Sequence, residues 1–228
     1  RDDETRVLDV ALDFVFDSHE GFTRAFSKEF GITPHQYGKE TPPLYLFIPD
    51  PVVTNRKNKE DLIMSKNANT IFVQVIERPE RKFLCKRAKT ATEYFGYCEE
   101  VGCDIWGLLT SVKEALYEPV GAWMPENMRP EGTSEYVQGV ELPLDYSGNV
   151  PDGFDLVELP ACKLMVFQGQ PYDDADFENA IDDMWELMKN YKPEIYGFKF
   201  APEDAPRIQL APQGYRGYIE ALPVRSVQ

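Results

Sequence analysis

Histidine is almost absent from this sequence. The 228 residues include two, His19 and His35, and none follows His35. Serine or cysteine nucleophiles paired with histidine, and acid–base catalysis by histidine, are therefore excluded from the larger C-terminal part of the chain. Carboxylate, tyrosine and lysine chemistry remain open there.

Cysteines and long apolar runs are also scarce. The four cysteines, Cys85, Cys98, Cys103 and Cys162, form no CxxC pair and have no histidine nearby. A structural zinc site needs about four ligands at short spacing, so neither a metal nor a cofactor is predicted. No apolar run approaches the roughly 18 residues of a membrane span, and no signal peptide opens the chain. We expect a cytoplasmic protein with reduced thiols and no membrane partner.

Basic residues are outnumbered by acidic ones. The chain has 24 Lys and Arg against 39 Asp and Glu, a formal net charge of −15. This balance argues against a basic surface that coats nucleic acid, but it allows a small DNA-reading segment and suits the binding of cations. The hydrophobic fraction of 43% is sufficient for a packed core.

The first forty residues have the pattern of helices joined by short turns. Apolar positions at helical spacing predict a helix over residues 5–16. Ser18 is suited to cap a second helix that ends at Gly31, and Thr33-Pro34 begins a further helical turn. This order is the helix-turn-helix layout.

The second helix presents a polar stripe that we expect to face outward. Its members share helical spacing and are Glu20, Thr23, Arg24, Ser27 and Lys28. Arg24 and Lys28 lie one turn apart, at a spacing that suits contacts to phosphates or a guanine edge. The alternative is an ordinary solvated face, because residues 1–38 carry four basic and eight acidic side chains.

The run ALDFVFDSHEGFTRAFSKEFGITPHQY (residues 11–37) closely resembles the second helix-turn-helix of AraC-type transcription regulators. The matching positions are Phe16, Ser18, Phe22, Arg24, Phe26, Phe30, Gly31, Pro34 and Tyr37, while Val15 departs from the usual glycine. The resemblance implies DNA as a partner. The family's first motif is absent here, so we expect this chain alone to bind DNA weakly.

Residues 39–70 have the composition of a linker or arm. Four prolines bracket the apolar run Leu44–Ile48, which we expect to dock as an edge strand, and residues 55–69 are polar and charged.

The rest of the chain contains an internal repeat, over about 71–145 and 154–228. Ile76-Glu77-Arg78-Pro79 recurs as Val157-Glu158-Leu159-Pro160, and Trp106 recurs as Trp185. Each copy predicts strand, helix, strand, strand. In the first copy we expect an extended segment over 70–88, a helix over 94–112, and strands over 120–124 and 136–142. In the second copy we expect an extended segment over 154–168, a helix from Asp173 or Asp174 to about Tyr191, and strands over 195–200, 207–210 and 215–224.

The predicted fold is therefore α+β, with an all-α segment followed by a duplicated β-α-β-β domain of antiparallel sheets. Two such units would join their sheets, with both helices on one face and a central cleft where the units meet. This half resembles GyrI-like effector-binding domains, which are found fused to AraC-type regulators, in its element order and its V-E-L-P and final E-x-x-P-V motifs. The predicted division is 1–38, 39–70 and 71–228, and a homodimer remains open.

The GyrI-like resemblance implies a small, lipophilic, cationic effector held by aromatic rings and a buried glutamate. A lone carboxylate in an apolar site is costly until a cation pairs with it. The candidates are Glu220 on the last strand and Glu141 on its counterpart. Many relatives place the glutamate four residues before the strand's proline, whereas Glu220 lies three before Pro223. Because a one-residue shift reverses the face, we expect Glu220 to point away from the cleft unless a bulge intervenes.

Six aromatic residues are candidates for the cleft walls: Trp106, Trp123, Tyr136, Trp185, Tyr196 and Tyr218. Trp106 and Trp185 lie on the apolar helix faces, where plain core packing is the alternative. Tyr136 and Tyr218 occupy nearly equivalent strand positions, which suits two walls of one cleft, and partly exposed strand tyrosines are the alternative.

The sequence leads to a ligand-responsive regulator fragment that is not an enzyme. The rival hypothesis is a GyrI-like hydrolase in which Glu220 acts with Tyr218 or Tyr136, which would require a water within reach of the carboxylate. A module that titrates another protein through its acidic surface is the third hypothesis.

Overall fold

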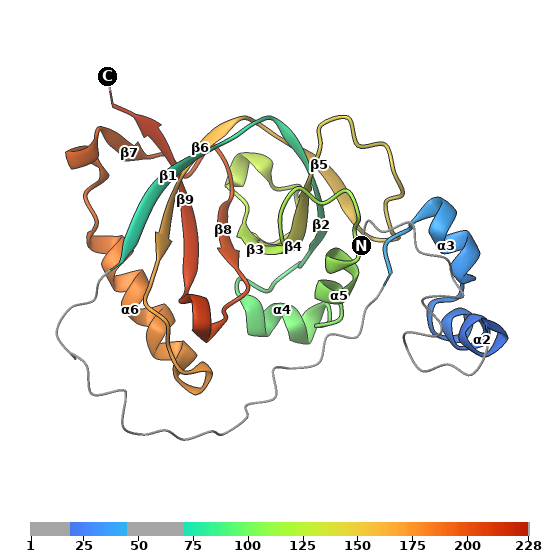
Figure 1. Cartoon of the computed structure of the whole chain (residues 1–228). Helices are drawn as coiled ribbons and strands as arrows, with labels where there is room; N and C mark the ends of the chain where they lie inside the picture. Colours follow the sequence, from blue (N-terminus) through green and yellow to red (C-terminus); the bar gives the residue numbers. More distant parts are fainter. Residues whose placement is uncertain (1–18, 45–70, 228) are drawn as a thin grey trace.

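The computed structural model describes residues 19–44 and 71–227. Helices α2 (His19–Phe30) and α3 (Pro34–Glu40) come first, and Figure 1 shows them at one end of the body. The buried residue Leu44 joins them to the body, because its N–H donates to Ser111 Oγ at 2.6 Å. The helix predicted over residues 5–16, and all of the predicted arm beyond Leu44, lie outside the described residues.

The turn between α2 and α3 forms where the sequence predicts it. Gly31 follows α2 in the left-handed region, with φ of +71°. Thr33 caps α3 by accepting from the N–H of Gln36, whose side chain accepts in return from the N–H of Thr33. The ring of Tyr37 lies 5.8 Å from that of Phe26, so α3 packs on α2.

Both repeats follow the predicted order of an extended segment, a helical segment and then strands, with two strands after the helices in the first copy and three in the second. The first copy comprises β1 (Phe72–Arg78), β2 (Arg81–Arg87), α4 (Tyr94–Glu100), α5 (Ile105–Thr110), β3 (Val120–Trp123), the 3₁₀ turn η1 (Glu126–Met128) and β4 (Tyr136–Leu142). The second comprises β5 (Asp155–Leu159), β6 (Cys162–Gln168), η2 (Asp174–Asp176), α6 (Phe177–Asn190), η3 (Pro193–Tyr196), β7 (Phe198–Phe200), β8 (Arg207–Leu210), η4 (Gly214–Arg216) and β9 (Ile219–Ser226).

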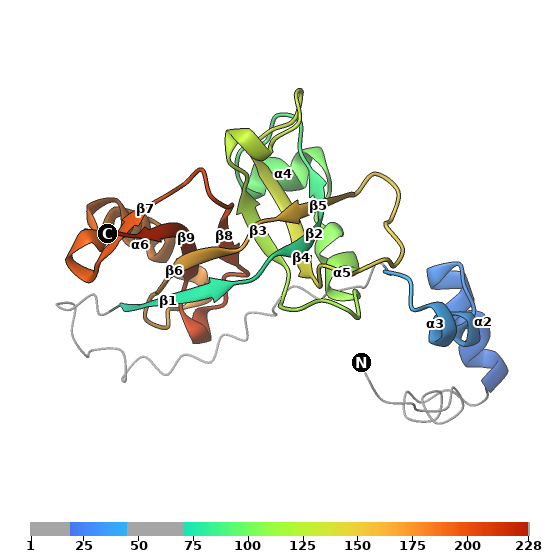
Figure 2. The same ribbon diagram turned by 90° about the horizontal axis from the view of Figure 1, so that it is seen from above.

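All nine strands of the described chain join one antiparallel sheet, in the order β1-β6-β9-β8-β3-β4-β2-β5, with β7 added to β9. The two repeats meet along a seam where β3 pairs with β8. The repeats also meet along two bent ribbons, one formed by the consecutive strands β1 and β2 and the other by β5 and β6. Strand β1 pairs with β6 and β2 pairs with β5, from Phe72↔Gln168 to Cys85↔Asp155. Figure 2 shows the two ribbons running side by side across both halves. The sheet is therefore strongly curled.

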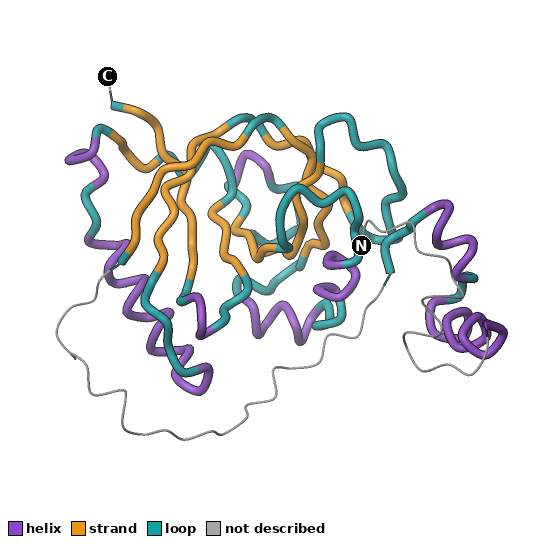
Figure 3. Tube along the Cα trace, in the orientation of Figure 1, coloured by secondary structure: helices purple, strands orange, loops and turns teal. Residues whose placement is uncertain are grey.

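The helices α4, α5 and α6 lie on the same face of the curled sheet (Figures 1 and 3). Strand alternation separates two cores: on β2, Leu84 packs under α4 and α5, whereas Phe83 and Cys85 face the cluster on the opposite side. A third cluster lies under α6 around Met184 and Met188. With 14 residues, α6 is the longest described helix, and none of the described helices is long and apolar enough to cross a membrane.

The helical segment predicted over residues 94–112 is broken, which corrects the expected single stripe. Gly102 adopts φ of +110°, and the chain turns between α4 and α5. Tyr97 is consequently the fully buried residue of α4, while Tyr94 is 43% exposed. The segments expected as strands at 195–200 and 215–224 likewise begin with the 3₁₀ turns η3 and η4.

A buried ion pair holds the bends of the two long ribbons together. The Arg81 side chain is 1% exposed, and its Nε donates to Glu141 Oε1 on β4. Its Nη1 donates to the carbonyl oxygens of Pro79 at 3.1 Å and Pro160 at 2.9 Å, one at each bend. Arg78 adds a second cation, with Nε 3.3 Å from Glu141 Oε2. Glu141 is therefore occupied by two arginines, of which Arg81 also binds the second repeat.

We predict that Glu141→Gln lowers the free energy of unfolding by about 3–5 kcal/mol, because it leaves Arg81 buried without its counter-charge. Urea denaturation of the whole chain measures this. The matched control is Glu77→Gln, which breaks the exposed pair of Glu77 with Lys163 and should change stability little. Equal effects of the two substitutions would contradict the structural role of Glu141.

Candidate functional site

The most buried acidic side chain near the seam is Glu220 on β9, which is 0% exposed. Its Oε2 accepts hydrogen bonds from the indole N–H of Trp185 at 2.8 Å and from the Tyr218 hydroxyl at 2.6 Å. Its Oε1 accepts from Nε of Arg207 on β8. Both carboxylate oxygens are thus bound by protein donors, and Arg207 supplies the counter-charge.

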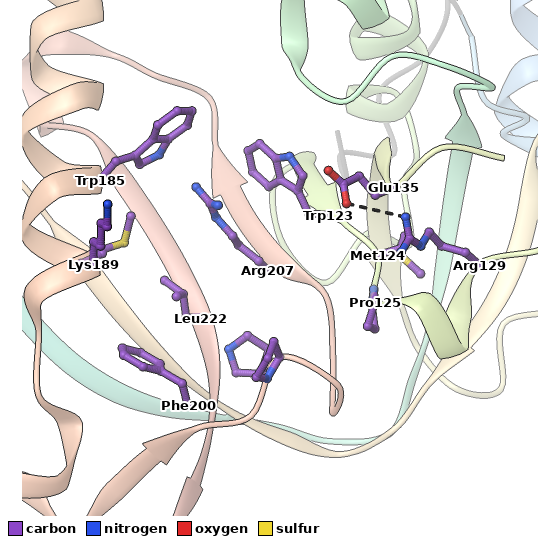
Figure 4. A pocket seen from close by; sticks show the side chains of 13 residues that line it. Trp123, Met124, Pro125, Arg129, Glu135, Trp185, Lys189, Phe200, Arg207 and Leu222 are labelled. Atoms are coloured by element: carbon purple, nitrogen blue, oxygen red, sulfur yellow. Dashed lines mark ion pairs between the residues drawn. The ribbon is translucent and has the colours of Figure 1, made fainter.

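The Arg207 guanidinium lies between two indole rings. Its central carbon is 4.4 Å from the centroid of the Trp123 ring and 5.3 Å from that of the Trp185 ring. Figure 4 shows the guanidinium between the two tryptophans. Both distances are within the roughly 6 Å over which cation–π attraction acts. A carboxylate and two indoles therefore surround a cation here, and the cation belongs to the protein.

Sheet register brings these residues together. Trp123 pairs with Arg207 across the seam, and Gln209 pairs with Glu220 on the next strand. Residues two apart on a strand share a face, so Arg207 and Gln209 face the same side as Glu220. The indole N–H of Trp123 donates to the carbonyl of Thr92 at 2.9 Å, which fixes the ring.

Trp185 reaches the site from α6. The neighbouring residues Met184 and Met188 anchor the helix in the core below it. Trp185 itself remains 40% exposed and turns its indole toward the seam. The alternative of plain core packing for Trp185 is therefore not what the structure adopts.

A cleft of about 610 Å³ opens beside Arg207. Its apolar walls include Met124, Pro125, Met188, Phe200 and Leu222, which come from both repeats (Figure 4). This volume is in the range of small-molecule sites, which are mostly apolar with a few polar groups that fix orientation.

Charged side chains also line this cleft. Arg129 pairs with Glu135, their atoms Nη1 and Oε2 lying 3.6 Å apart. Lys189 contributes an exposed ammonium from α6. Below them, the Arg207 side chain is 34% exposed, whereas Glu220 has no access to solvent.

Glu220 faces the cleft side of the sheet, which corrects the expectation that it would point away without a bulge. The pairing of β6 with β9 runs without interruption from Lys163↔Val224 to Gln168↔Ile219, so no bulge is needed. Ile219, the neighbouring residue, packs instead against the opposite core. The glutamate-to-proline spacing implied by the GyrI-like resemblance therefore predicted the wrong face for Glu220.

Four of the other seven candidates gather around the same seam. Trp123, Trp185 and Tyr218 contact Glu220 or its arginine. Tyr136 is 1% exposed and packs edge-on against Trp123, with ring centroids 5.1 Å apart. Tyr136 therefore supports a wall of the site without opening onto the cleft.

The remaining three candidates lie elsewhere. Glu141 is on the face opposite α4 and α5, bound by Arg81 and Arg78. Trp106 is half-buried on α5 and does not line the cleft. Tyr196 is 64% exposed and stacks on Tyr191, with centroids 6.0 Å apart. None of the three reaches Glu220.

Arg207 is the charged residue beside Glu220 that the sequence did not reveal, and the apolar wall residues Phe200 and Leu222 were likewise not predicted. The available signal was the alternation Arg-Ile-Gln-Leu on β8, which places Arg207 and Gln209 on one face and buried Ile208 on the other. This alternation alone does not predict which residue of β9 pairs with which residue of β8.

The first repeat has a neutral group where the second has its carboxylate. The offset that relates Tyr136 to Tyr218 also relates Gln138 to Glu220. Gln138 is 1% exposed, and neither its Oε1 nor its Nε2 has a hydrogen-bond partner among the described residues. Of these two equivalent positions, Gln138 and Glu220, only the second therefore carries a negative charge.

The candidate DNA-binding stripe on α2 is only partly exposed. Arg24 and Lys28 are exposed, as expected. Thr23 and Ser27 differ from the expectation, because their hydroxyl oxygens are buried and have no hydrogen-bond partner among the described residues. The side chain of Glu20 lies outside the described part of the structure.

No protein-family model matches the sequence, and no curated protein does. Similar solved structures include a protein described as a bacterial transcription regulation protein from Staphylococcus aureus MU50, 15% identical, with 68% of this chain and 99% of that chain covered and a TM-score of 0.43. SAV2435 bound to tetraphenylphosphonium is 14% identical, with 68% and 94% covered and a TM-score of 0.44. The EcmrR C-terminal domain is 15% identical, with 69% and 99% covered and a TM-score of 0.39. Because each TM-score is below 0.5, the assignment of function depends on the side chains of the cleft itself.

The phenols of the site remain protonated at physiological pH. Burial, and then the neighbouring charge of Glu220, raises the pKa of Tyr218. Burial is also the main cause of the raised pKa values of Tyr136 and Tyr97. Tyr218 is consequently a hydrogen-bond donor to Glu220 and a poor base.

We predict that the free energy of unfolding falls as the pH rises above about 10. The phenols of Tyr218, Tyr136 and Tyr97 ionise in the unfolded chain but stay neutral in the folded one, and each should contribute a loss of about 1.4 kcal/mol per pH unit. Urea denaturation between pH 9 and 11 measures the slope. Tyr136→Phe should reduce it by one phenol's share. An unchanged slope would contradict the assigned burial of that hydroxyl.

Proposed function

We propose that this chain is part of a ligand-responsive transcription regulator, and that the cleft beside Glu220 binds a lipophilic organic cation as its effector. The observation that carries the proposal is the position of the Arg207 guanidinium between Trp123 and Trp185, against buried Glu220. The groups that hold this delocalised cation would offer the same contacts to another cation that took its place.

Electrostatics favours a cation over other ligands in the position that Arg207 occupies. A buried carboxylate without a counter-charge is strongly destabilised, so Glu220 requires a positive partner. The indole faces of Trp123 and Trp185 each add about 0.5–2 kcal/mol of cation–π attraction. The apolar walls provided by Phe200 and Leu222 suit the hydrocarbon part of such a ligand.

The proposed regulatory role joins the cleft to the helix-turn-helix segment. We propose that Arg24 and Lys28, together with Glu20, belong to a DNA-reading surface that functions within a complete AraC-type DNA-binding domain, whereas the buried hydroxyls of Thr23 and Ser27 support the packing of α2. Exposed Arg24 and Lys28 support contacts to phosphates. Leu44 links this segment to Ser111, directly after α5, and so offers a route by which a ligand in the body could bias the DNA-binding segment.

The rival hydrolase hypothesis finds less support. Both oxygens of Glu220 already accept hydrogen bonds from Trp185, Tyr218 and Arg207, and the carboxylate has no solvent access. A general base needs a water within hydrogen-bond reach. The arrangement favours holding a charge over activating a nucleophile.

The test compares three ligands of one shape and different charge: 2-naphthamidinium, 2-naphthamide and 2-naphthoate. We predict that the amidinium stabilises the chain, by about 2.7 kcal/mol at a concentration 100 times its dissociation constant, and that the other two do not. Differential scanning fluorimetry and calorimetric titration measure this.

The variant Glu220→Gln should abolish the stabilisation by the amidinium. The matched control Glu158→Gln removes the same charge from an exposed position on β5 and should retain it. Stabilisation by the naphthoate or the neutral amide alone would overturn the cation proposal.

A further inference from the structure

The cation site is already filled by the protein itself. Arg207 occupies Oε1 of Glu220 and lies over the faces of both indoles, while Oε2 is taken by Trp185 and Tyr218. A second cation therefore finds no free carboxylate oxygen at Glu220. It would also meet the like charge of Arg207 at close range, which is unfavourable.

Arg207 is able to leave the site, whereas Glu220 and Trp123 are held in place. Its side chain is 34% exposed and borders the open cleft, so the guanidinium can reach water by rotating its side chain. Within the described part of the chain, Glu220 is the one carboxylate that pairs with it. Glu220 is fully buried and Trp123 is fixed by its hydrogen bond to Thr92. Another cation can therefore bind Glu220 only if it replaces Arg207.

We infer that Arg207 is a resident cation that an effector must displace, so that Arg207 sets both the affinity and the selectivity of the site. This inference rests on the proposed function of the same cleft. Glu220 cannot remain unpaired when Arg207 leaves, because its burial requires a counter-charge. Ligands without a positive charge therefore cannot complete the exchange.

The contacts of Arg207 also specify the shape of its competitor. The guanidinium is planar, lies between two ring faces and donates an N–H to Oε1. A planar cation with N–H donors, such as an aromatic amidinium, reproduces all three contacts. A tetrahedral quaternary ammonium of equal charge has no N–H to donate and is thicker than the guanidinium it replaces. The structure assigns the preferred ligand class as aromatic amidines or guanidines.

Removal of the competitor tests the inference. In Arg207→Gln, we predict that 2-naphthamidinium binds at least tenfold more tightly than to the wild type, measured by calorimetric titration of the whole chain. In Arg207→Lys, which keeps the charge but loses the planar group, the affinity should lie between those of the wild type and Arg207→Gln. The control Arg225→Gln removes an equal charge from an exposed position on β9 and should leave the affinity unchanged.

An equal or weaker affinity in Arg207→Gln overturns the inference. If the wild type binds the amidinium in a Glu220-dependent manner and the variant gains nothing, only the displacement fails. If neither protein binds any cation, the proposed function fails with it.

A measurement on the wild type keeps the inference testable even if Arg207→Gln does not fold. The Nε–H of Arg207, hydrogen-bonded to a buried carboxylate, should give a resolved side-chain signal in nitrogen-15 spectra, assigned by its absence in Arg207→Lys. Saturation with 2-naphthamidinium should shift that signal to the position of a solvated arginine. A signal that stays unchanged in the saturated complex overturns displacement.

Discussion

The structure depends on one requirement: the carboxylate of Glu220, which has no access to solvent, must be paired with a positive charge. Residues from both repeats surround this pair, since Glu220 and Trp185 come from the second copy and Trp123 from the first. Arg207 on β8 satisfies it in the absence of a ligand. The site is therefore a property of the seam, and neither repeat forms it alone.

The same constraint is met in a different way at the bends of the sheet. Glu141 is nearly as buried as Glu220, but it is enclosed by Arg81 and Arg78, and Arg81 also binds the carbonyls at both bends. Arg81 is 1% exposed and has no route to water, whereas a third of the Arg207 side chain is exposed. Because of this difference in solvent access, the Arg81–Glu141 pair is permanent, whereas Arg207 can exchange from its pair with Glu220.

Local sequence patterns predicted most helices and strands. They could not predict the features that depend on pairing between strands far apart in the sequence. Apolar periodicity located β4 and β8 at their observed bounds and ordered both repeats. The side of the sheet on which Glu220 lies, and its pairing with Arg207, depend on strand register. The relevant pairs, Trp123↔Arg207 and Gln209↔Glu220, join residues of different strands, which local sequence patterns do not predict. The break at Gly102 was missed because the apolar stripe continues across a turn.

A double-mutant cycle between Glu220 and Arg207 tests most directly whether the buried carboxylate requires a cation. Unfolding free energies of Glu220→Gln, Arg207→Gln and the double variant would be compared with that of the wild type. We predict that Arg207→Gln is destabilised, that adding Glu220→Gln recovers much of the lost stability, and that the coupling free energy is about 1–3 kcal/mol. Additive effects of the two substitutions would contradict it.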